Sequence, residues 1–354
     1  MTDLHDRLSE SMTWQEAQTS ASAVEAALPI GRDGGGWLAS LAGDRREVIY
    51  SGAGSSYYVA MTAASAHRTV TGLPALAVPP SELLLRPIAA LGRAVAGERP
   101  IVAISRSGST SEIVDLVETS AAQGRRTIGI TCRADAPLAH RADRALVSPR
   151  GDESAIVMTR SFTSMLVLTL RAIAGAAAEL APTADIAAAA SRTAADLDGL
   201  PRIWSSTAAV VERALELAAQ PWLRIVVLGG GASLGLAQEG CLKLTEMSQV
   251  AANAWEPFEF RHGPISTCEP GVLVVGLVGG DGLEEERRVL EEAASLGATV
   301  WTLDPETVGG GIDPIARLPL LLPPLQALAI GHAFARGLDP DRPRHLSQVV
   351  RLGS

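Results

Sequence analysis

Apolar runs that end in clusters of glycine and hydroxyl residues constrain the fold of this chain most strongly. The run EVIY at 47–50 leads into GAGSS at 52–56, and IVAI at 101–104 leads into SRSGST at 105–110. Short apolar runs without polar alternation are typical of strands that are buried on both faces of a parallel sheet. Helical stretches follow both clusters, so we expect each cluster to join a buried strand to a helix.

Strand and helix patterns alternate along the chain and then restart. Strands are predicted at 47–51, 100–105, 126–131 and 145–148, with helices at 8–28, 55–71, 110–123, 135–142, 159–180 and 184–198. The pattern begins again with RIVVLGGGAS at 224–233, and further strands are predicted at 271–280, 298–303 and 318–323. We expect the first helix to end at Pro29 and the glycines that follow it. The alternation predicts an α/β fold of two similar halves, each a parallel sheet flanked by helices.

The segment 105–110, called the hydroxyl loop below, has the chemistry of an anion site. Ligands of open parallel sheets bind outside the carboxyl ends of the strands, where helix N-termini also favour negative charge. Four hydroxyl residues in SRSGST add hydrogen-bond donors that suit a phosphate or a sulfonate. Plain helix N-capping is the alternative, above all for GAGSS. Neither segment has the spacing of a Walker loop or a complete G-x-G-x-x-G motif.

A charged stripe is predicted on the helix at 235–250. Glu239, Lys243 and Glu246 are spaced i, i+4 and i+7, which places them on one face, either towards the interior or as an exposed Glu–Lys pair. The segment WEPFEFRHGPIS at 255–266 then carries His262 beside a Gly-Pro turn. A histidine titrates near neutral pH, so His262 is either an acid–base candidate or a structural residue.

The overall composition limits the classes of partner. The chain has 354 residues, a net charge of −9 and a pI near 5.3, which disfavours nucleic acid and anionic membranes as partners. Its three cysteines are widely spaced and show no metal-ligand spacing, so we expect thiols in a reducing compartment and no metal. The polar N-terminal segment does not have the pattern of a signal peptide, and a cytoplasmic location is predicted.

With these motifs in view, the chain resembles the sugar isomerase (SIS) domain family. The segments GAGSS, SRSGSTSEIVDLV, VMTRSFTSML, GLAQEGCLKLTEM and EFRHGPIS match the family pattern in order, over roughly residues 30–350. The likeness is to double-SIS proteins, such as the isomerase part of glucosamine-6-phosphate synthase and tagatose-6-phosphate ketose/aldose isomerase-like proteins. The resemblance implies two SIS domains of flavodoxin-like, three-layer α/β/α architecture. We expect an N-terminal helical segment at 1–32, a first SIS domain at 33–200 and a second at 201–354.

The resemblance also implies a role for individual residues. The substrate's acidic group would bind Ser105, Arg106, Ser107 and Thr110 of the hydroxyl loop, with Ser55, Ser56 and Thr159 also lining the pocket. Glu246 matches the base that moves a proton between C1 and C2, and Lys243 and Glu239 match its polar neighbours. His262 matches the histidine that helps to open the sugar ring, which the partner subunit of a homodimer often supplies. No organic cofactor or metal is implied.

One position departs from the family pattern. The segment DPDRPRHLSQVVRL is similar to the family's closing segment, in which a lysine usually follows two residues after the leucine; here that position is Gln348. In the synthase this lysine can form an imine with the ketose, which a glutamine cannot do. The sequence therefore favours aldose–ketose isomerisation of a 6-phosphorylated or sulfonated hexose. An amino-sugar phosphate deaminase or deglycase and a non-catalytic sugar-phosphate sensor are the alternatives.

Overall fold

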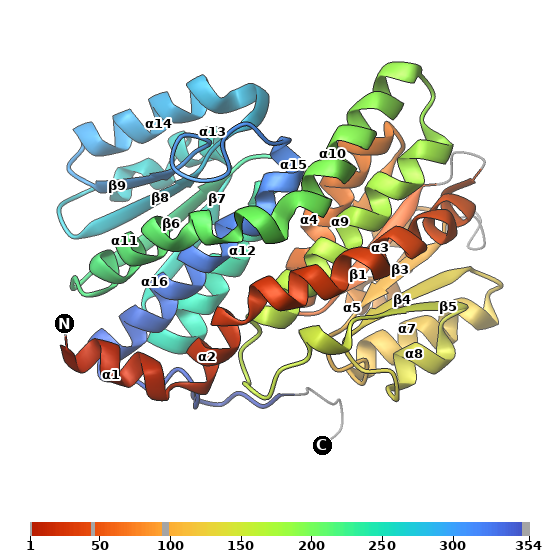
Figure 1. Cartoon of the computed structure of the whole chain (residues 1–354), viewed down its shortest axis with the longest axis horizontal. Coiled ribbons are helices and arrows are strands. Elements are labelled where there is room, and N and C mark those ends of the chain that lie inside the picture. The colour runs from red at the N-terminus through yellow and green to blue at the C-terminus, as the bar shows by residue number, and fades with distance from the viewer. Residues whose placement is uncertain (1, 44–46, 94–98, 349–354) are drawn as a thin grey trace. The chain divides into compact units, whose positions relative to one another are not determined.

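The computed structural model describes residues 2–43, 47–93 and 99–348 (Figure 1). By its internal contacts the chain divides into two compact units, and each holds one sheet. The first unit comprises Thr19–Glu153, Arg160–Pro201 and Ser347–Ser354; the second comprises Met1–Gln18, Ser154–Thr159 and Arg202–Leu346. The domain boundaries predicted at 32/33 and 200/201 stay predictions.

The first unit has a five-stranded parallel sheet in the order β2-β1-β3-β4-β5. Its elements are α3 (Ser20–Ala42), β1 (Val48–Gly52), α4 (Ser55–Thr71), β2 (Ala75–Ala77), α5 (Pro80–Leu85), α6 (Pro87–Leu91), β3 (Ile101–Ile104), α7 (Ser111–Ala122), β4 (Thr127–Thr131), α8 (Pro137–Arg141), β5 (Arg144–Val147), α9 (Arg160–Leu180) and α10 (Ala184–Ile203). Helix α4 packs on β1 and β2, and α9 packs on α4. The opposite face packs Ile49, Ile101 and Ala103 against apolar residues of α5, α7 and α8.

The second unit repeats this layout with a four-stranded parallel sheet in the order β7-β6-β8-β9. Its elements are α1 (Thr2–Glu10), α2 (Met12–Gln18), α11 (Ala208–Ala218), β6 (Arg224–Gly229), α12 (Ser233–Lys243), β7 (Ala251–Trp255), α13 (Pro257–Arg261), β8 (Val272–Leu277), α14 (Leu283–Ser295), β9 (Thr299–Leu303), α15 (Pro314–Arg317) and α16 (Leu322–Ala335). Helices α12 and α16 pack together beside β6 and β7, and the other face of the sheet packs on α13 and α14. The predicted α/β fold with two helix-flanked parallel sheets is confirmed.

Two predicted elements are wrong. The apolar run 318–323 is a 3-10 turn, Leu318–Leu321, that leads into α16, because prolines are accepted in the first turn of a helix but not inside a sheet. The helix predicted at 8–28 is instead three helices, and α3 runs through Pro29 and the glycines after it to Ala42. The edge strands β2 and β7 were not predicted.

The glycines of α3 explain why this helix continues. A Cβ atom on Gly31 would lie 2.5 Å from the carbonyl oxygen of Leu168 in α9, and one on Gly35 would lie 3.0 Å from the Cα atom of Gly175. The two helices therefore pack backbone to backbone at these positions. This close contact with α9 compensates for the low helix propensity of glycine.

Two helical segments have the length and composition of membrane spans. Arg160–Leu180 and Pro314–Ala335 are both predominantly apolar, and 89% of the most apolar 18 residues of each is buried. They are core helices of their units.

The glycine contact predicts opposite effects at two positions of α3. Replacing Gly31 with Ala should lower the free energy of unfolding by about 1–3 kcal/mol, because the new methyl group overlaps α9. Gly36 is exposed, and a Cβ atom there would meet only Glu179 Oε1 at 3.6 Å. Replacing Gly36 with Ala should therefore raise the free energy of unfolding by up to about 1 kcal/mol. Urea denaturation of both variants measures this, and equal effects at the two positions would contradict the packing.

Candidate active site

The hydroxyl loop begins where β3 ends and leads into α7. Strand β3 pairs with β1 so that Ile104 lies opposite Gly52, and the hydroxyl loop therefore leaves the sheet beside the turn that carries Ser55 and Ser56. Ser55, Ser56, Ser105 and Ser107 are all buried. The N-cap Thr110 makes no capping hydrogen bond with its side chain. Its hydroxyl lies 3.2 Å from that of Ser105, so plain N-capping does not explain the hydroxyl group.

Backbone contacts fix the shape of the hydroxyl loop. Gly108 has φ +58°, and a Cβ atom there would lie 2.6 Å from that of Ala136, so only glycine fits. The Gly108 amide donates to the Ser105 carbonyl oxygen and to Ser105 Oγ, at 3.1 and 3.2 Å. The Arg106 carbonyl oxygen accepts hydrogen bonds from the Thr131 hydroxyl and from the Cys132 amide, both at 3.0 Å. The loop is thus held rigidly at the carboxyl edge of the first sheet.

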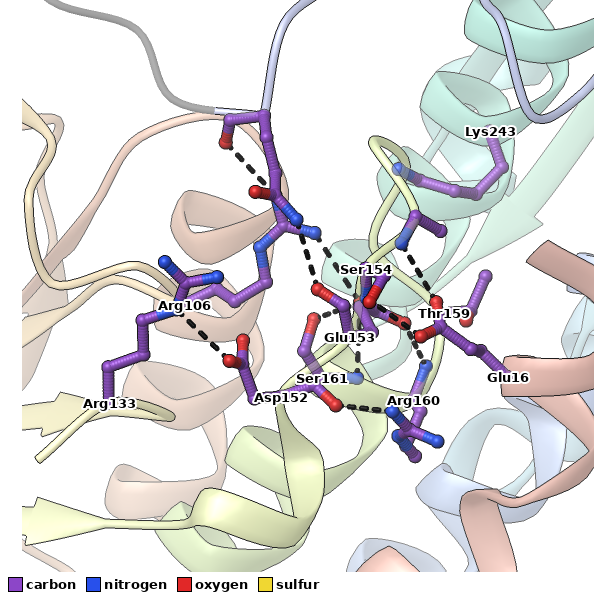
Figure 2. A network of polar contacts seen from close by, with 12 residues as sticks. Glu16, Arg106, Arg133, Asp152, Glu153, Ser154, Thr159, Arg160, Ser161 and Lys243 are labelled. Atoms are coloured by element: carbon purple, nitrogen blue, oxygen red, sulfur yellow. Dashed lines mark hydrogen bonds and ion pairs between the residues drawn. The ribbon is translucent and has the colours of Figure 1, made fainter. Parts of the chain in front are cut away.

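Arg106 itself is engaged by the protein. Its side chain is buried; Nη1 lies 3.7 Å from Glu153 Oε1, and Nη2 donates to the carbonyl oxygen of Gln348 at 3.0 Å (Figure 2). The Gln348 side chain donates in turn to the Glu153 carbonyl oxygen at 3.0 Å. Sequence reasoning missed Glu153, because its partners are far away in the chain and its neighbours show no motif that indicates a buried carboxylate.

The charged stripe lies in the second unit and faces inwards. Lys243 Nζ lies 2.6 Å from Glu246 Oε2 and 3.4 Å from Glu239 Oε1. The exposed fractions of the side chains are 2% for Lys243, 3% for Glu239 and 20% for Glu246. The alternative of an exposed ion pair is therefore wrong. Of the three groups, the Glu246 carboxylate is the one that solvent or a ligand reaches.

Glu246 lies in a π-helical turn at the end of its helix. The predicted helix at 235–250 is α-helical over Ser233–Lys243 and then π-helical over Leu244–Ser248, after which Gln249 adopts φ +55°. Single π-helical turns within α-helices occur frequently at functional sites. Here the turn carries the most accessible carboxylate of the stripe.

The remaining predicted site residues of the second unit lie on other elements. His262 is exposed and follows α13, whose N-terminus is capped by Glu256 through the amides of Phe258 and Glu259 at 2.8 and 2.9 Å. Thr159 is fully buried, and its carbonyl oxygen accepts a hydrogen bond from Gln326 at 3.2 Å. The predicted residues thus divide between the units. All predicted anion-binding residues except Thr159 lie in the first unit with Gln348, and the stripe, His262 and Thr159 lie in the second.

The second sheet has no counterpart of the hydroxyl loop. The amide of Gly279, after β8, donates to the buried carboxylate of Glu286 at 3.2 Å. Burial and the nearby Glu256 carboxylate raise the pKa of Glu286, while the Gly279 hydrogen bond opposes the increase. Arg317 donates to the carbonyl oxygens of Val278 and Leu303 at 3.0 and 2.8 Å. In the second sheet, the side chains of Glu286 and Arg317 therefore bind the backbone at the strand ends. The corresponding strand end of the first sheet carries the hydroxyl loop.

Comparisons with known proteins agree with this arrangement. The SIS domain model matches residues 41–174 and 219–306, more than half of the chain. Glutamine–fructose-6-phosphate aminotransferase (isomerizing) of Aeropyrum pernix is 31% identical over 277 residues, which are 73% of this chain and 44% of that protein. The chain spans about half the length of the curated relatives that it matches.

Two solved structures cover almost the whole chain. Glucosamine-6-phosphate deaminase from Thermotoga maritima is 28% identical, with a TM-score of 0.69 over 92% of this chain and 99% of that one. Tagatose-6-phosphate ketose/aldose isomerase from Escherichia coli is 23% identical, with a TM-score of 0.74 over 98% of both chains; at this identity the likeness concerns the fold.

The buried stripe predicts a strong effect of removing its cation. Lys243→Met should lower the free energy of unfolding by about 3–5 kcal/mol, because it leaves the buried Glu239 carboxylate without its ammonium partner. Adding Glu239→Gln to Lys243→Met should restore part of the loss. Chemical denaturation of both variants measures this, and a Lys243→Met protein as stable as the parent would show that the stripe is solvated.

Proposed function

The chain belongs to the SIS domain family, and we propose that it is an aldose–ketose isomerase acting on a hexose with a phosphate or sulfonate at C6. The observation that carries this proposal is the stripe of two carboxylates around a buried lysine, with Glu246 as its reachable member. In this proposal the hydroxyl loop binds the acidic group of the sugar, and Glu246 moves the proton.

The chemistry needs the residue types that are present. Aldose–ketose exchange passes through an enediol, for which one carboxylate takes a proton from C2 and returns it to C1. The ammonium group of Lys243 holds this carboxylate by a 2.6 Å hydrogen bond and supplies positive charge beside the developing oxyanion. His262 donates and accepts the protons that open the sugar ring. These steps involve only side chains of the protein.

Gln348 supports isomerisation over ammonia transfer. Its side-chain nitrogen is an amide that donates to the Glu153 carbonyl oxygen, and an amide nitrogen is not nucleophilic enough to form an imine with a ketose. Enediol isomerisation of a free aldose needs no such adduct. The aminotransferase activity that gives the Aeropyrum pernix protein its name is therefore not proposed for this chain.

Amino-sugar phosphate deamination is the second candidate. The likeness to the Thermotoga maritima deaminase, over 99% of that chain, favours it. It would use the same loop and carboxylate on a substrate that carries an amino group at C2. Ammonia release from glucosamine 6-phosphate, measured beside ketose formation from glucose 6-phosphate, separates the two activities.

The role of Glu246 predicts the result of an isotope experiment. In D2O, the parent protein should place deuterium at C2 of an anionic aldohexose and form the ketose. Glu246→Gln should slow both by about 10²–10⁴-fold, the usual contribution of a general base. NMR and mass spectrometry of the sugar follow both events across a panel of hexose 6-phosphates and a 6-sulfonated hexose.

Exposed Glu291 of α14 provides the matched control, because Glu291→Gln removes the same charge outside the proposed site. Full activity of Glu246→Gln would disprove the role of Glu246. Tight binding of the sugars with no exchange by the parent protein would instead favour the sensor.

We further propose that the chain forms a homodimer, which predicts complementation between two inactive variants. If His262 serves the partner's site, coexpressed His262→Ala and Glu246→Gln chains form mixed dimers in which one site keeps both groups. The mixed sample should recover about a quarter of the parent activity, since half of the dimers are mixed and each has one intact site. Activity no higher than that of the separate variants would place His262 in the same subunit's site.

A further inference from the structure

We propose that Arg106 fastens Gln348 to the hydroxyl loop, and that Glu153 is the positioning residue that holds Arg106 in this role. The inference rests on the proposed function insofar as the hydroxyl loop is assigned to the substrate's acidic group. All three residues belong to the first unit. They are brought together by the fold alone, since Arg106 and Gln348 lie 242 positions apart in the sequence.

The contacts form a closed triangle. Arg106 Nη2 donates to the Gln348 carbonyl oxygen at 3.0 Å, and Nη1 lies 3.7 Å from Glu153 Oε1. Gln348 Nε2 completes the triangle by donating to the Glu153 carbonyl oxygen at 3.0 Å. Because Arg106 contacts the main chain of Gln348, this fastening does not depend on the side chain that replaces the family lysine.

Glu153 is a rigid support for Arg106. Its side chain has no exposed surface. Its carboxylate accepts hydrogen bonds from the Arg160 amide at 3.0 Å, from the Ser161 amide at 3.3 Å and from the Ser161 hydroxyl (Figure 2). These donors belong to the first turn of α9, where the helix dipole also stabilises a negative charge. These hydrogen bonds hold the Glu153 carboxylate in place independently of its contact with the Arg106 guanidinium group.

Burial makes this arrangement specific. The exposed fraction of the Arg106 side chain is 5%, and a buried guanidinium is stable only with charged and hydrogen-bonding partners. The carboxylate of Glu153 and the carbonyl oxygen of Gln348 are two such partners, and the two residues lie 195 positions apart in the sequence. Occupation of the loop and the position of Gln348 are thereby coupled through one side chain.

Hydrogen exchange of full-length variants tests the fastening without any ligand. Arg106→Gln and Glu153→Gln should each accelerate exchange in the peptide that contains Gln348 by roughly tenfold or more, the factor expected for one hydrogen bond to a charged group. The double variant should exchange no faster than either single variant, because both remove the same contact. Asp152→Asn is the matched control, because it removes a neighbouring carboxylate that forms an ion pair with Arg133. Asp152 Oδ2 lies 3.0 Å from Arg133 Nε, and the side chain of Asp152 is partly exposed.

A third variant separates a general loss of stability from loss of the contact between Arg106 and Gln348. Glu153 also binds the first turn of α9, so Ser161→Ala removes one of those hydrogen bonds but leaves the contact with Arg106. It should lower the free energy of unfolding without accelerating exchange at Gln348. Arg106→Gln, which leaves these hydrogen bonds of α9 intact, keeps the test valid if Glu153→Gln folds poorly.

Titration with inorganic phosphate, followed by ³¹P NMR, distinguishes this fastening role of Arg106 from a role as an anion ligand. Loss of the fastening should weaken phosphate binding in Arg106→Gln and in Glu153→Gln alike. Unchanged exchange at Gln348 in both variants would overturn the proposal, and tighter phosphate binding by Glu153→Gln would show instead that Arg106 is an anion ligand restrained by Glu153. A parent protein that binds no phosphate would count against the proposed function alone, since the exchange result stands without a ligand.

Discussion

Parallel pairing of β1 with β3 is the constraint on which the placement of the hydroxyl loop beside Ser55 and Ser56 depends. With Gly52 opposite Ile104, the turn at Ser55 and Ser56 and the hydroxyl loop must leave the sheet at the same edge. Both lead into helices, α4 and α7, so two helix N-termini point towards one region. The small hydroxyl residues have little to contribute to a hydrophobic core, which is why we propose that they serve as hydrogen-bond donors to an anion.

The two sheets show how one layout supports different chemistry. In each, a central strand turns through glycines into a helix, and the neighbouring strand ends in a second loop. In the first sheet that second loop is lined by hydroxyl groups. In the second, Glu286 and Arg317 bind the corresponding backbone groups, and the most accessible carboxylate of the stripe, Glu246, lies on the π-helical turn that follows α12. The duplication thus leaves the hydroxyl loop in one unit and the buried stripe of Glu239, Lys243 and Glu246 in the other.

Local signals predicted much of this. The apolar runs and glycine clusters located the central strands, and the i, i+4, i+7 spacing placed Glu239, Lys243 and Glu246 on one face. The spacing could not decide whether that face is buried, because the helix's packing partner α16 lies some 80 positions further along the chain. Edge strands β2 and β7 escaped prediction because both are short and rich in alanine, which has little strand propensity.

One error and one omission have their physical origin in contacts between distant segments. Pro29 and the glycines of α3 are helix-ending signals that close packing on α9 overrides. Glu153 gave no signal at all, since its importance comes from Arg106 and Gln348. Where a residue's role is set by partners far away in the chain, the sequence shows the residue but not its environment.

A crystal structure with a bound hexose 6-phosphate tests the central claim most directly. The account predicts phosphate oxygens hydrogen-bonded to Ser105, Ser107 and Thr110, with C1 and C2 of the sugar within hydrogen-bond reach of the Glu246 carboxylate. Phosphate bound at any other strand end, or a sugar whose first two carbons do not approach Glu246, would contradict it.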